Sequence, residues 1–484
     1  MNISVSGLCY SYDAQEPVLK DVTTHFLTGE LSFLSGATGS GKTTLMRCIN
    51  GLIPHRFKRG RLSGSVLLDG QIAQGRSLME LSLRVGTVMQ NPDRQMVATH
   101  AMDEIAFGPE NLGLPPNDIR SRIERLAKDL SILDLMDRDI STLSEGEKQK
   151  VAIASILAKE SGAVLLDEPL LSLDPWSSRK AMEYFRKLAN KGIAVVVSEH
   201  RQQRVLEALP DRCIVLDRGR IAFDGTADKY PVSVPPERRR TGRPDILSPI
   251  MLAMEDVSFG YPGGAPALDH FDMQIHKGDI IAVMGANGAG KSTLCRHIIG
   301  LCKPMSGRVL LEGCDTREMT VAQIARQVGC VFQNPSAMFH EHTLRREISF
   351  GPRNLECSSA EIDFRVTRAA QEMGLDMHLD GSPFKLSFGE QKRASVACIL
   401  AMCPRVLILD EPTAGQDSTN VIKLMDQLVP LRNLDALLFT THDSDLAYAF
   451  ANRCVVMDKG RIVRDGLPEE VLTDIGMLER CHLN

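Results

Sequence analysis

The chain has 484 residues, of which 43% are hydrophobic and 24% are charged, close to ordinary globular usage. This composition excludes a largely disordered or collagen-like chain, and the length predicts about two to four domains. The net charge of −5 gives no general electrostatic reason to bind nucleic acid. No apolar run reaches the roughly 18–20 residues that span a bilayer. The twelve cysteines include no CxxC pair, which favours free thiols in a reducing, cytoplasmic compartment.

The first informative segment is a glycine-rich loop between an apolar strand pattern at residues 31–34 and a helix-compatible stretch at residues 45–52. Its GxxxxGK[ST] pattern lets backbone N–H groups converge on phosphates at the positive end of the following helix. We predict that this loop binds a nucleotide through Gly36, Ala37, Thr38, Gly39, Ser40, Gly41, Lys42, Thr43 and Thr44. Lys42 is expected to contact the β- and γ-phosphates, and Thr43 to ligate Mg²⁺.

An acidic pair, Asp167-Glu168, ends an apolar run that is typical of a buried parallel strand. Functional residues gather at the carboxyl ends of such strands in open α/β sheets. We therefore expect Asp167 to hold Mg²⁺ and Glu168 to polarise or deprotonate an attacking water. His200 follows the next apolar strand pattern, where it could donate to the γ-phosphate or serve a structural role.

Residues 226–250 contain five prolines and an arginine run, which disfavours both helix and strand. Beyond them the same motifs return in the same order. Gln-Asn-Pro occurs at residues 90–92 and 333–335, and 54 residues separate its Gln from the Ser of an LSxGE motif in both copies. We predict two homologous domains, residues 1–228 and 251–484, and a linker at residues 229–250. The first is longer by six residues between Gly51 and Gly64.

The second copy supplies an equivalent set of predicted site residues. Its phosphate loop consists of Gly285, Ala286, Asn287, Gly288, Ala289, Gly290, Lys291, Ser292 and Thr293. Its acidic pair is Asp410-Glu411 and its strand-end histidine is His442. Lys291 is expected on the phosphates, Ser292 and Asp410 on Mg²⁺, and Glu411 on the water.

These motifs resemble the ABC ATPase family over nearly the whole chain, twice over. LSEGE at residues 143–147 and LSFGE at residues 386–390 look like the family's signature motif, with Glu147 and Glu390 where Gln is common. The resemblance implies an α/β fold of two tandem P-loop ATPase domains that bind ATP with Mg²⁺. Each domain would carry an antiparallel β region and a helical subdomain, at about residues 92–142 and 335–385.

The resemblance also implies roles that spacing alone does not supply. Tyr12 and Tyr261 would stack on adenine. The glutamines of the two Gln-Asn-Pro segments would sense Mg²⁺ and a membrane partner; they are Gln90 and Gln333. The histidines would act as switches next to the γ-phosphate; they are His200 and His442. Arg201 departs from the usual family Asp, which is present at Asp443.

Family ATPases work as head-to-tail dimers, so the resemblance implies that this chain supplies both halves of its own pseudo-dimer. One ATP site would combine Lys42 with Ser387 and Gly389 of the other half. The second site would combine Lys291 with Ser144 and Gly146.

A segment with the pattern EIxFGPxNL begins 14 residues after each Gln, at residues 104–112 and 347–355. It looks like the ATPases of energy-coupling factor transporters, which take up vitamins and transition-metal ions. That resemblance implies two membrane partners, a coupling protein and a separate substrate-binding protein, and a peripheral position on the cytoplasmic face of the cell membrane. Met96 and Met338 are candidate contacts with the coupling protein, and Phe107 and Phe350 could line its grooves or belong to the core.

Other interpretations remain open from the sequence. The FGPxNL pattern is also compatible with a simple Gly-Pro turn between helices. A tandem ABC translation factor would act on ribosomes, but it would carry a long, charged, helical linker. A sugar-import tandem ATPase would usually lack the FGPxNL segment and often has a degenerate second site.

Overall fold

The computed structural model describes residues 1–12, 16–199, 202–231, 248–263, 265–414, 416, 418–431 and 433–483, with the backbone alone at residues 203, 204 and 418. The chain divides into two compact units, Met1–Ser233 and Val234–Asn484. Most of the predicted linker, residues 229–250, lies outside the described residues.

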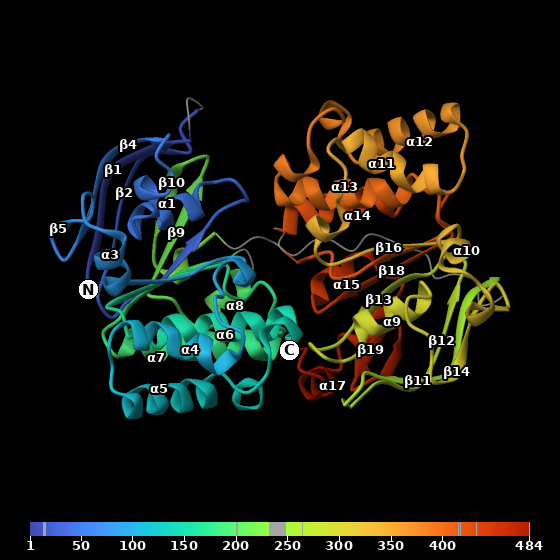
Figure 1. The fold of residues 1–484 in the computed structure, drawn as a ribbon, viewed down its shortest axis with the longest axis horizontal. Helices are drawn as coiled ribbons and strands as arrows, with labels where there is room; N and C mark the ends of the chain where they lie inside the picture. Colours follow the sequence, from blue (N-terminus) through green and yellow to red (C-terminus); the bar gives the residue numbers. More distant parts are fainter. Residues whose placement is uncertain are drawn as a thin grey trace. The chain divides into compact units, whose positions relative to one another are not determined.

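A six-stranded sheet forms the centre of the first unit, in the order β10-β9-β3-β8-β7-β6. Its strands β9 and β10 are labelled in Figure 1. Its strands are β3 (Leu31–Ser35), β6 (Val85–Val88), β7 (Ala163–Asp167), β8 (Ala194–Ser198), β9 (Arg212–Asp217) and β10 (Arg220–Gly225). All pairs are parallel except β9 with β10. β3, β7 and β8 are buried at every position, as expected for parallel strands covered on both faces.

An antiparallel sheet in the order β2-β1-β4-β5 accompanies the central sheet. It consists of β1 (Ile3–Ser11), β2 (Leu19–Phe26), β4 (Arg61–Leu68) and β5 (Gln71–Ile72). Buried and more exposed residues alternate over much of β2, which is typical of a strand with one face on the core. Its buried side chains share one core with those of α1 (Lys42–Ile49), so this sheet supports the helix that follows the phosphate loop.

The remaining helices of the first unit include the predicted helical subdomain. They are α2 (Leu52–His55), α3 (Leu78–Arg84), α4 (Ala101–Asn111), α5 (Pro116–Asp129), α6 (Glu145–Leu157), α7 (Pro175–Asn190) and α8 (Gln202–Leu206), with short 3₁₀ turns η1 (Pro92–Arg94), η2 (Leu133–Leu135), η3 (Ile140–Thr142) and η4 (Ala227–Lys229). In α5, Ile119, Ile123 and Leu126 are buried at helical spacing and face the core.

The second unit repeats this architecture. Its central sheet has the order β16-β17-β18-β13-β19-β20 and its antiparallel sheet the order β12-β11-β14-β15. The strands are β11 (Ile250–Gly260), β12 (Pro266–His276), β13 (Ile280–Met284), β14 (Ser306–Leu311), β15 (Cys314–Asp315), β16 (Val328–Val331), β17 (Val406–Leu409), β18 (Ala436–Thr441), β19 (Arg453–Asp458) and β20 (Arg461–Gly466).

The helices of the second unit follow the same plan and extend it at the C-terminal end. They are α9 (Lys291–Ile298), α10 (Val321–Ala325), α11 (Leu344–Asn354), α12 (Ser359–Glu372), α13 (Phe388–Leu400), α14 (Ser418–Leu428), α15 (Ser444–Phe450), α16 (Pro468–Val471) and α17 (Ile475–Arg480), with 3₁₀ turns η5 (Thr316–Glu318), η6 (Pro335–Met338), η7 (Asp376–His378) and η8 (Pro383–Lys385). Met477 and Leu478 of α17 join the core of this unit.

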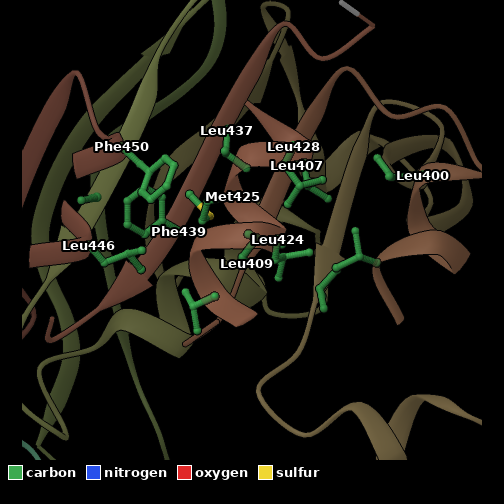
Figure 2. Close-up of a cluster of buried hydrophobic side chains, with 14 of the residues drawn as sticks. Leu400, Leu407, Leu409, Leu424, Met425, Leu428, Leu437, Phe439, Leu446 and Phe450 are labelled. Carbon is green, nitrogen blue, oxygen red and sulfur yellow. The ribbon is translucent and has the colours of Figure 1, made fainter. Parts of the chain in front are cut away.

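The close-up in Figure 2 shows how this core fixes the strands of the second central sheet. Leu407 and Leu409 of β17 and Phe439 of β18 are fully buried among side chains of α14 and α15. Full burial of one such side chain contributes roughly 1.5–3 kcal/mol relative to exposure. The core therefore holds the carboxyl ends of β17 and β18 in fixed register, where the acidic pair and the strand-end histidine follow.

These observations confirm the predicted α/β class with an antiparallel region and a helical part in each unit. The interpretation of Gly-Pro as a turn between helices is wrong, because Gly108-Pro109 lies inside α4 and Gly351-Pro352 inside α11. Within the described parts of the chain, no helix is long and apolar enough to cross a bilayer.

Candidate nucleotide site in each half

The phosphate loop of the first unit joins β3 to α1, and its glycines adopt backbone angles that other residues rarely reach. Gly36 has φ +142° and Gly41 has φ +110°. A Cβ on Gly36 would lie 2.2 Å from the Leu216 carbonyl oxygen, so only glycine fits this close approach. Lys42 begins α1, is buried, and its Nζ donates to the carbonyls of Gly36 at 2.6 Å and Ala37 at 3.2 Å. The loop thus wraps around its own lysine at a helix N-terminus, where backbone N–H groups have no intrahelical partner.

The second phosphate loop has the same construction. Lys291 Nζ donates to the carbonyls of Gly285 at 2.7 Å and Ala286 at 3.1 Å. A Cβ on Gly290 would lie 2.3 Å from the Ala267 carbonyl oxygen. Lys291 Nζ also lies 3.3 Å from Glu411 Oε1, so the phosphate loop and the acidic pair of this half are in direct contact.

Asp167 closes β7 in a buried position. Burial, and next the charge of Glu168, raise the pKa of its carboxyl to about 6. Its Oδ1 has no hydrogen-bond partner among the residues that the structure describes, while the Thr43 hydroxyl bonds to the carboxylate. A buried carboxylate with a free oxygen next to a hydroxyl fits Mg²⁺, which takes hard oxygen ligands. Thr43 and Asp167 are therefore the residues of this half that would hold the ion.

Asp410 is the equivalent residue after β17. Thr440 Oγ1 donates to its Oδ1 at 2.7 Å, and the Ser292 hydroxyl bonds to it as well. Burial raises the pKa of this carboxyl too. Both halves therefore place a phosphate-loop hydroxyl against a buried carboxylate, the pairing expected of Mg²⁺ ligands.

Glu168 and Glu411 share an unusual backbone conformation. Their φ angles are +51° and +47°, in the left-handed region, and both side chains are buried. Such a conformation costs on the order of 1–3 kcal/mol in a residue other than glycine and is often found at functional sites. Gln90 Nε2 donates to Glu168 Oε2 at 2.7 Å, whereas Glu411 Oε2 lies 3.2 Å from His442 Nδ1. The predicted water-activating group is thus contacted by the predicted sensor glutamine in the first half and by the predicted switch histidine in the second.

The two tyrosines predicted to stack on adenine lie at the first turn of the helix that follows each phosphate loop. Tyr12 OH lies 3.2 Å from Thr44 Oγ1 and accepts from Arg47 at 3.1 Å. Tyr261 OH lies 3.5 Å from Thr293 Oγ1 and accepts from Arg296 at 2.9 Å. In the first unit the ring of Phe57, from the longer segment of that half, packs edge-on against Tyr12 with centroids 5.6 Å apart.

Each signature serine is the N-cap of a long helix, and the unusual Glu at the fifth motif position completes the cap. Ser144 Oγ accepts from Glu147 N, and the Ser144 N–H and Oγ donate to Glu147 Oε2 at 2.7 and 2.8 Å. Ser387 and Glu390 form the same capping box on α13. Glu thus performs the reciprocal capping that Gln can also perform, so the substitution preserves the local structure.

Several predicted residues are not brought together by the described structure. His200 and Arg201 lie outside the described residues. Because each unit is described by itself, the pairing of Ser144 and Gly146 with the second phosphate loop, and of Ser387 and Gly389 with the first, stays a prediction. Met96 and Met338 pack against the cores of their units and are only partly exposed. Phe107 and Phe350 do not belong to the core, because they are 49% and 39% exposed.

The role of a buried glutamate in the EIxFGPxNL segment was missed by sequence reasoning. Glu104 Oε2 accepts from the N–H groups of Val97 and Ala98 at 2.8 and 2.9 Å. Glu347 Oε2 accepts from His340 N and Glu341 N at 2.9 and 2.7 Å. The first residue of the motif therefore folds the preceding loop onto the helix, and its recurrence in both copies was the only signal available in the sequence.

The chain is similar in sequence to a known protein family in both of its units. The pattern of the ABC transporter family matches residues 19–171 and 268–414, one match in each unit. An ABC transporter ATP-binding protein of Methanosarcina mazei is 34% identical over 97% of this chain and 89% of its own length. A protein of the same description from Enterococcus faecalis is 32% identical, with 99% and 93% covered. A solved structure of CbiO1 from Clostridium perfringens, part of the ABC transporter complex CbiONQ, is 33% identical over 49% of this chain and 95% of that chain, with a TM-score of 0.44.

This chain belongs to the ABC transporter family, as a protein with two ATP-binding domains. It is a transport-coupled ATPase and the ATP-hydrolysing subunit of a transporter, in a family that binds ATP, generally with Mg²⁺, and works with transmembrane partners.

Proposed function

We propose that this chain powers an uptake transporter of the energy-coupling factor type, carrying a vitamin or a transition-metal ion. The observation that carries the proposal is the repeated EIxFGPxNL segment after each Gln-Asn-Pro. In both units its glutamate orders the loop that follows the Gln, and its phenylalanine is left exposed on the helix. The segment thus presents an apolar side chain close in sequence to the nucleotide site, which suits a membrane coupling protein as partner.

The same proposal assigns the chemistry of each site. Glu168 and Glu411 orient the attacking water and accept its proton, and His442 steadies Glu411 from 3.2 Å. Lys42 and Lys291 turn from their loop carbonyls to the phosphates of ATP. Bound Mg²⁺, held in the first half by Thr43 and Asp167, would neutralise charge on those phosphates. The ATP would lie between the phosphate loop of one half and the signature serine of the other.

Exposure explains which residues of the segment suit a contact with the coupling protein. Met96 and Met338 support the cores, so charges there would disturb folding. Phe107 is half-exposed on α4, and Val97, in the loop that Glu104 orders, is 65% exposed. Both are exposed apolar side chains of the first unit. In the second unit the ring of His340 packs edge-on against Phe350 at 4.2 Å, so the two halves offer unlike surfaces.

The test is a charge substitution at Phe107, with a matched control. Phe107→Glu should lower the fraction of the chain that co-purifies with membrane proteins, and lower uptake, without changing the melting temperature. The control is Phe364→Glu, which places the same charge at a 63% exposed phenylalanine on α12. Equal co-purification and uptake of both variants would place the coupling surface elsewhere. Recovery of ribosomes in place of membrane proteins with the unaltered chain would favour a translation factor.

A further inference from the structure

One buried lysine distinguishes the two halves at the place where the signature helix meets the Gln loop. Lys392 lies in α13, five residues after Ser387, and its side chain is completely buried. Its Nζ donates to the carbonyl oxygens of Phe332 at 3.0 Å and Gln333 at 3.1 Å. The ammonium therefore ties the backbone at Gln333 to the helix that carries the signature motif of the same half.

The first half has a neutral residue in the same position. Gln149 lies five residues after Ser144 in α6 and is also completely buried. Neither its amide nitrogen nor its amide oxygen has a hydrogen-bond partner among the described residues. It therefore makes no bond to the carbonyls of Met89 or Gln90, the counterparts of the two groups that Lys392 holds.

The outer contacts between loop and helix join matching positions in the two halves, but one is an ion pair and the other a neutral hydrogen bond. Lys148 Nζ donates to Asp93 Oδ1 at 2.8 Å in the first half. At the matching positions of the second half, Ser336 Oγ donates to Gln391 Oε1 at 2.9 Å. Each loop thus has one contact at the surface with its own signature helix. At the buried position below it, the second half has the two bonds of Lys392 to loop carbonyls and the first half has Gln149.

Electrostatics explain how an ammonium can be buried there. Desolvation of a charge is costly unless the charge is paired and hydrogen-bonded. Burial lowers the pKa of Lys392 to about 8, and the negative charges of Asp410 and Glu411 partly offset this effect. The ammonium also has two carbonyl acceptors. Because Gln149 is neutral, the second site holds one buried positive charge more than the first at this position.

We propose that Lys392 is a positioning residue that fixes the Gln333 loop to the second signature helix, so that loop and helix move as one body. In the first half the Gln90 loop lacks the buried bond and moves more independently of α6. The two nucleotide sites are then mechanically unequal, although both keep the same catalytic side chains. This inference rests on the proposed role of the Gln loop between nucleotide and membrane partner.

Hydrogen exchange of the full, nucleotide-free chain tests the mechanical half of the proposal. In Lys392→Gln, which copies the first half, amides of residues 333–340 should exchange faster by about ten-fold or more, because the loop opens without the helix. Gln149→Lys should slow exchange over residues 90–97. The control is Ser395→Ala, which removes a buried hydroxyl whose hydrogen bond to Lys392 O stays within α13. Unchanged exchange in both loops would overturn the proposal.

ATP turnover tests the consequence at the site. In a Glu168→Gln background, where the second site alone hydrolyses, Lys392→Gln should lower kcat by about ten-fold with little change in KM, because misplacement of a positioning group impairs the reaction more than binding. Lys392→Arg should restore part of kcat, and Lys392→Met should behave as Lys392→Gln. A fall in melting temperature without a change in kcat would assign Lys392 a merely structural role and overturn the inference. If Glu168→Gln alone abolished turnover, the proposal that the second site hydrolyses ATP would be wrong. The hydrogen-exchange result would still decide whether Lys392 fixes the Gln333 loop to the helix.

Discussion

Asp167 is a residue at which stability and function conflict. Its pKa of about 6 lies above the ordinary value of 3.8, because burial and the charge of Glu168 disfavour the carboxylate. The folded state therefore holds a proton that the unfolded state has released between about pH 4 and pH 6, and stability falls as the pH rises through this window. Above it, this difference in pKa corresponds to on the order of 3 kcal/mol of lost stability.

Replacing this carboxyl with an amide should recover part of that loss. We expect Asp167→Asn to be more stable than the unaltered chain by about 1–2 kcal/mol at pH 7.5 without Mg²⁺ or nucleotide, and the gain should disappear near pH 4. Stabilisation by Mg²⁺ with ATP should be weaker in the variant. Urea unfolding at both pH values measures the first effect, and a variant less stable at pH 7.5 would contradict it.

Glu168 and Glu411 permit a test of whether both sites hydrolyse ATP. Replacing either with Gln preserves side-chain shape and removes the proton acceptor, so ATP binding should persist while turnover at that site falls by about 10²–10⁴-fold. Equilibrium binding and single-turnover hydrolysis measure the two quantities. If Glu168→Gln left hydrolysis and transport unchanged, the first site would be structural only.

At the scale of elements, Glu104 connects α4 to the loop that follows Gln90. Its buried carboxylate accepts two backbone N–H groups, and loss of a hydrogen bond to a charged group costs roughly 1.5–3 kcal/mol. Glu104→Ala should therefore loosen residues 96–98 and lower uptake more strongly than hydrolysis by the isolated chain. Glu104→Gln keeps one acceptor oxygen and should be milder. Equal uptake by the unaltered chain and Glu104→Ala would show that this order is not needed for coupling.

Sequence reasoning succeeded where function depends on local pattern. The strand, loop and helix around Lys42 lie next to each other in the chain, so spacing was enough to predict them.

Sequence reasoning failed where a contact joins distant segments. The bond from Lys392 to Gln333 spans 59 residues, and a lysine after a signature motif looks like an ordinary solvated charge. The alternative interpretation of the Gly-Pro steps as turns was wrong, because Pro109 and Pro352 lie near the ends of their helices, where a lost backbone bond matters less.

For the whole molecule we predict that the two units form one ATP-bound pseudo-dimer within a single chain. About 20 residues connect the two predicted domains, and a covalent tether of this length gives an effective concentration near the millimolar range. Addition of ATP to a Glu168→Gln, Glu411→Gln double variant should leave the molar mass in light scattering at that of one chain. A molar mass of two chains in the ATP-bound state would contradict this arrangement.

The covalent connection of the two units also fixes their stoichiometry. Two separately encoded ATPases can assemble as mixed pairs or as pairs of identical copies, and each half must then remain functional against either partner. In one polypeptide, each half with Gln149 is always joined to a half with Lys392. Likewise, the half with Phe57 in its longer segment is always joined to a half whose segment is six residues shorter. Differences between the halves can therefore accumulate without passing through an assembly of two like subunits. A division of labour between the two ATP sites is thus inherited as a single unit with the gene.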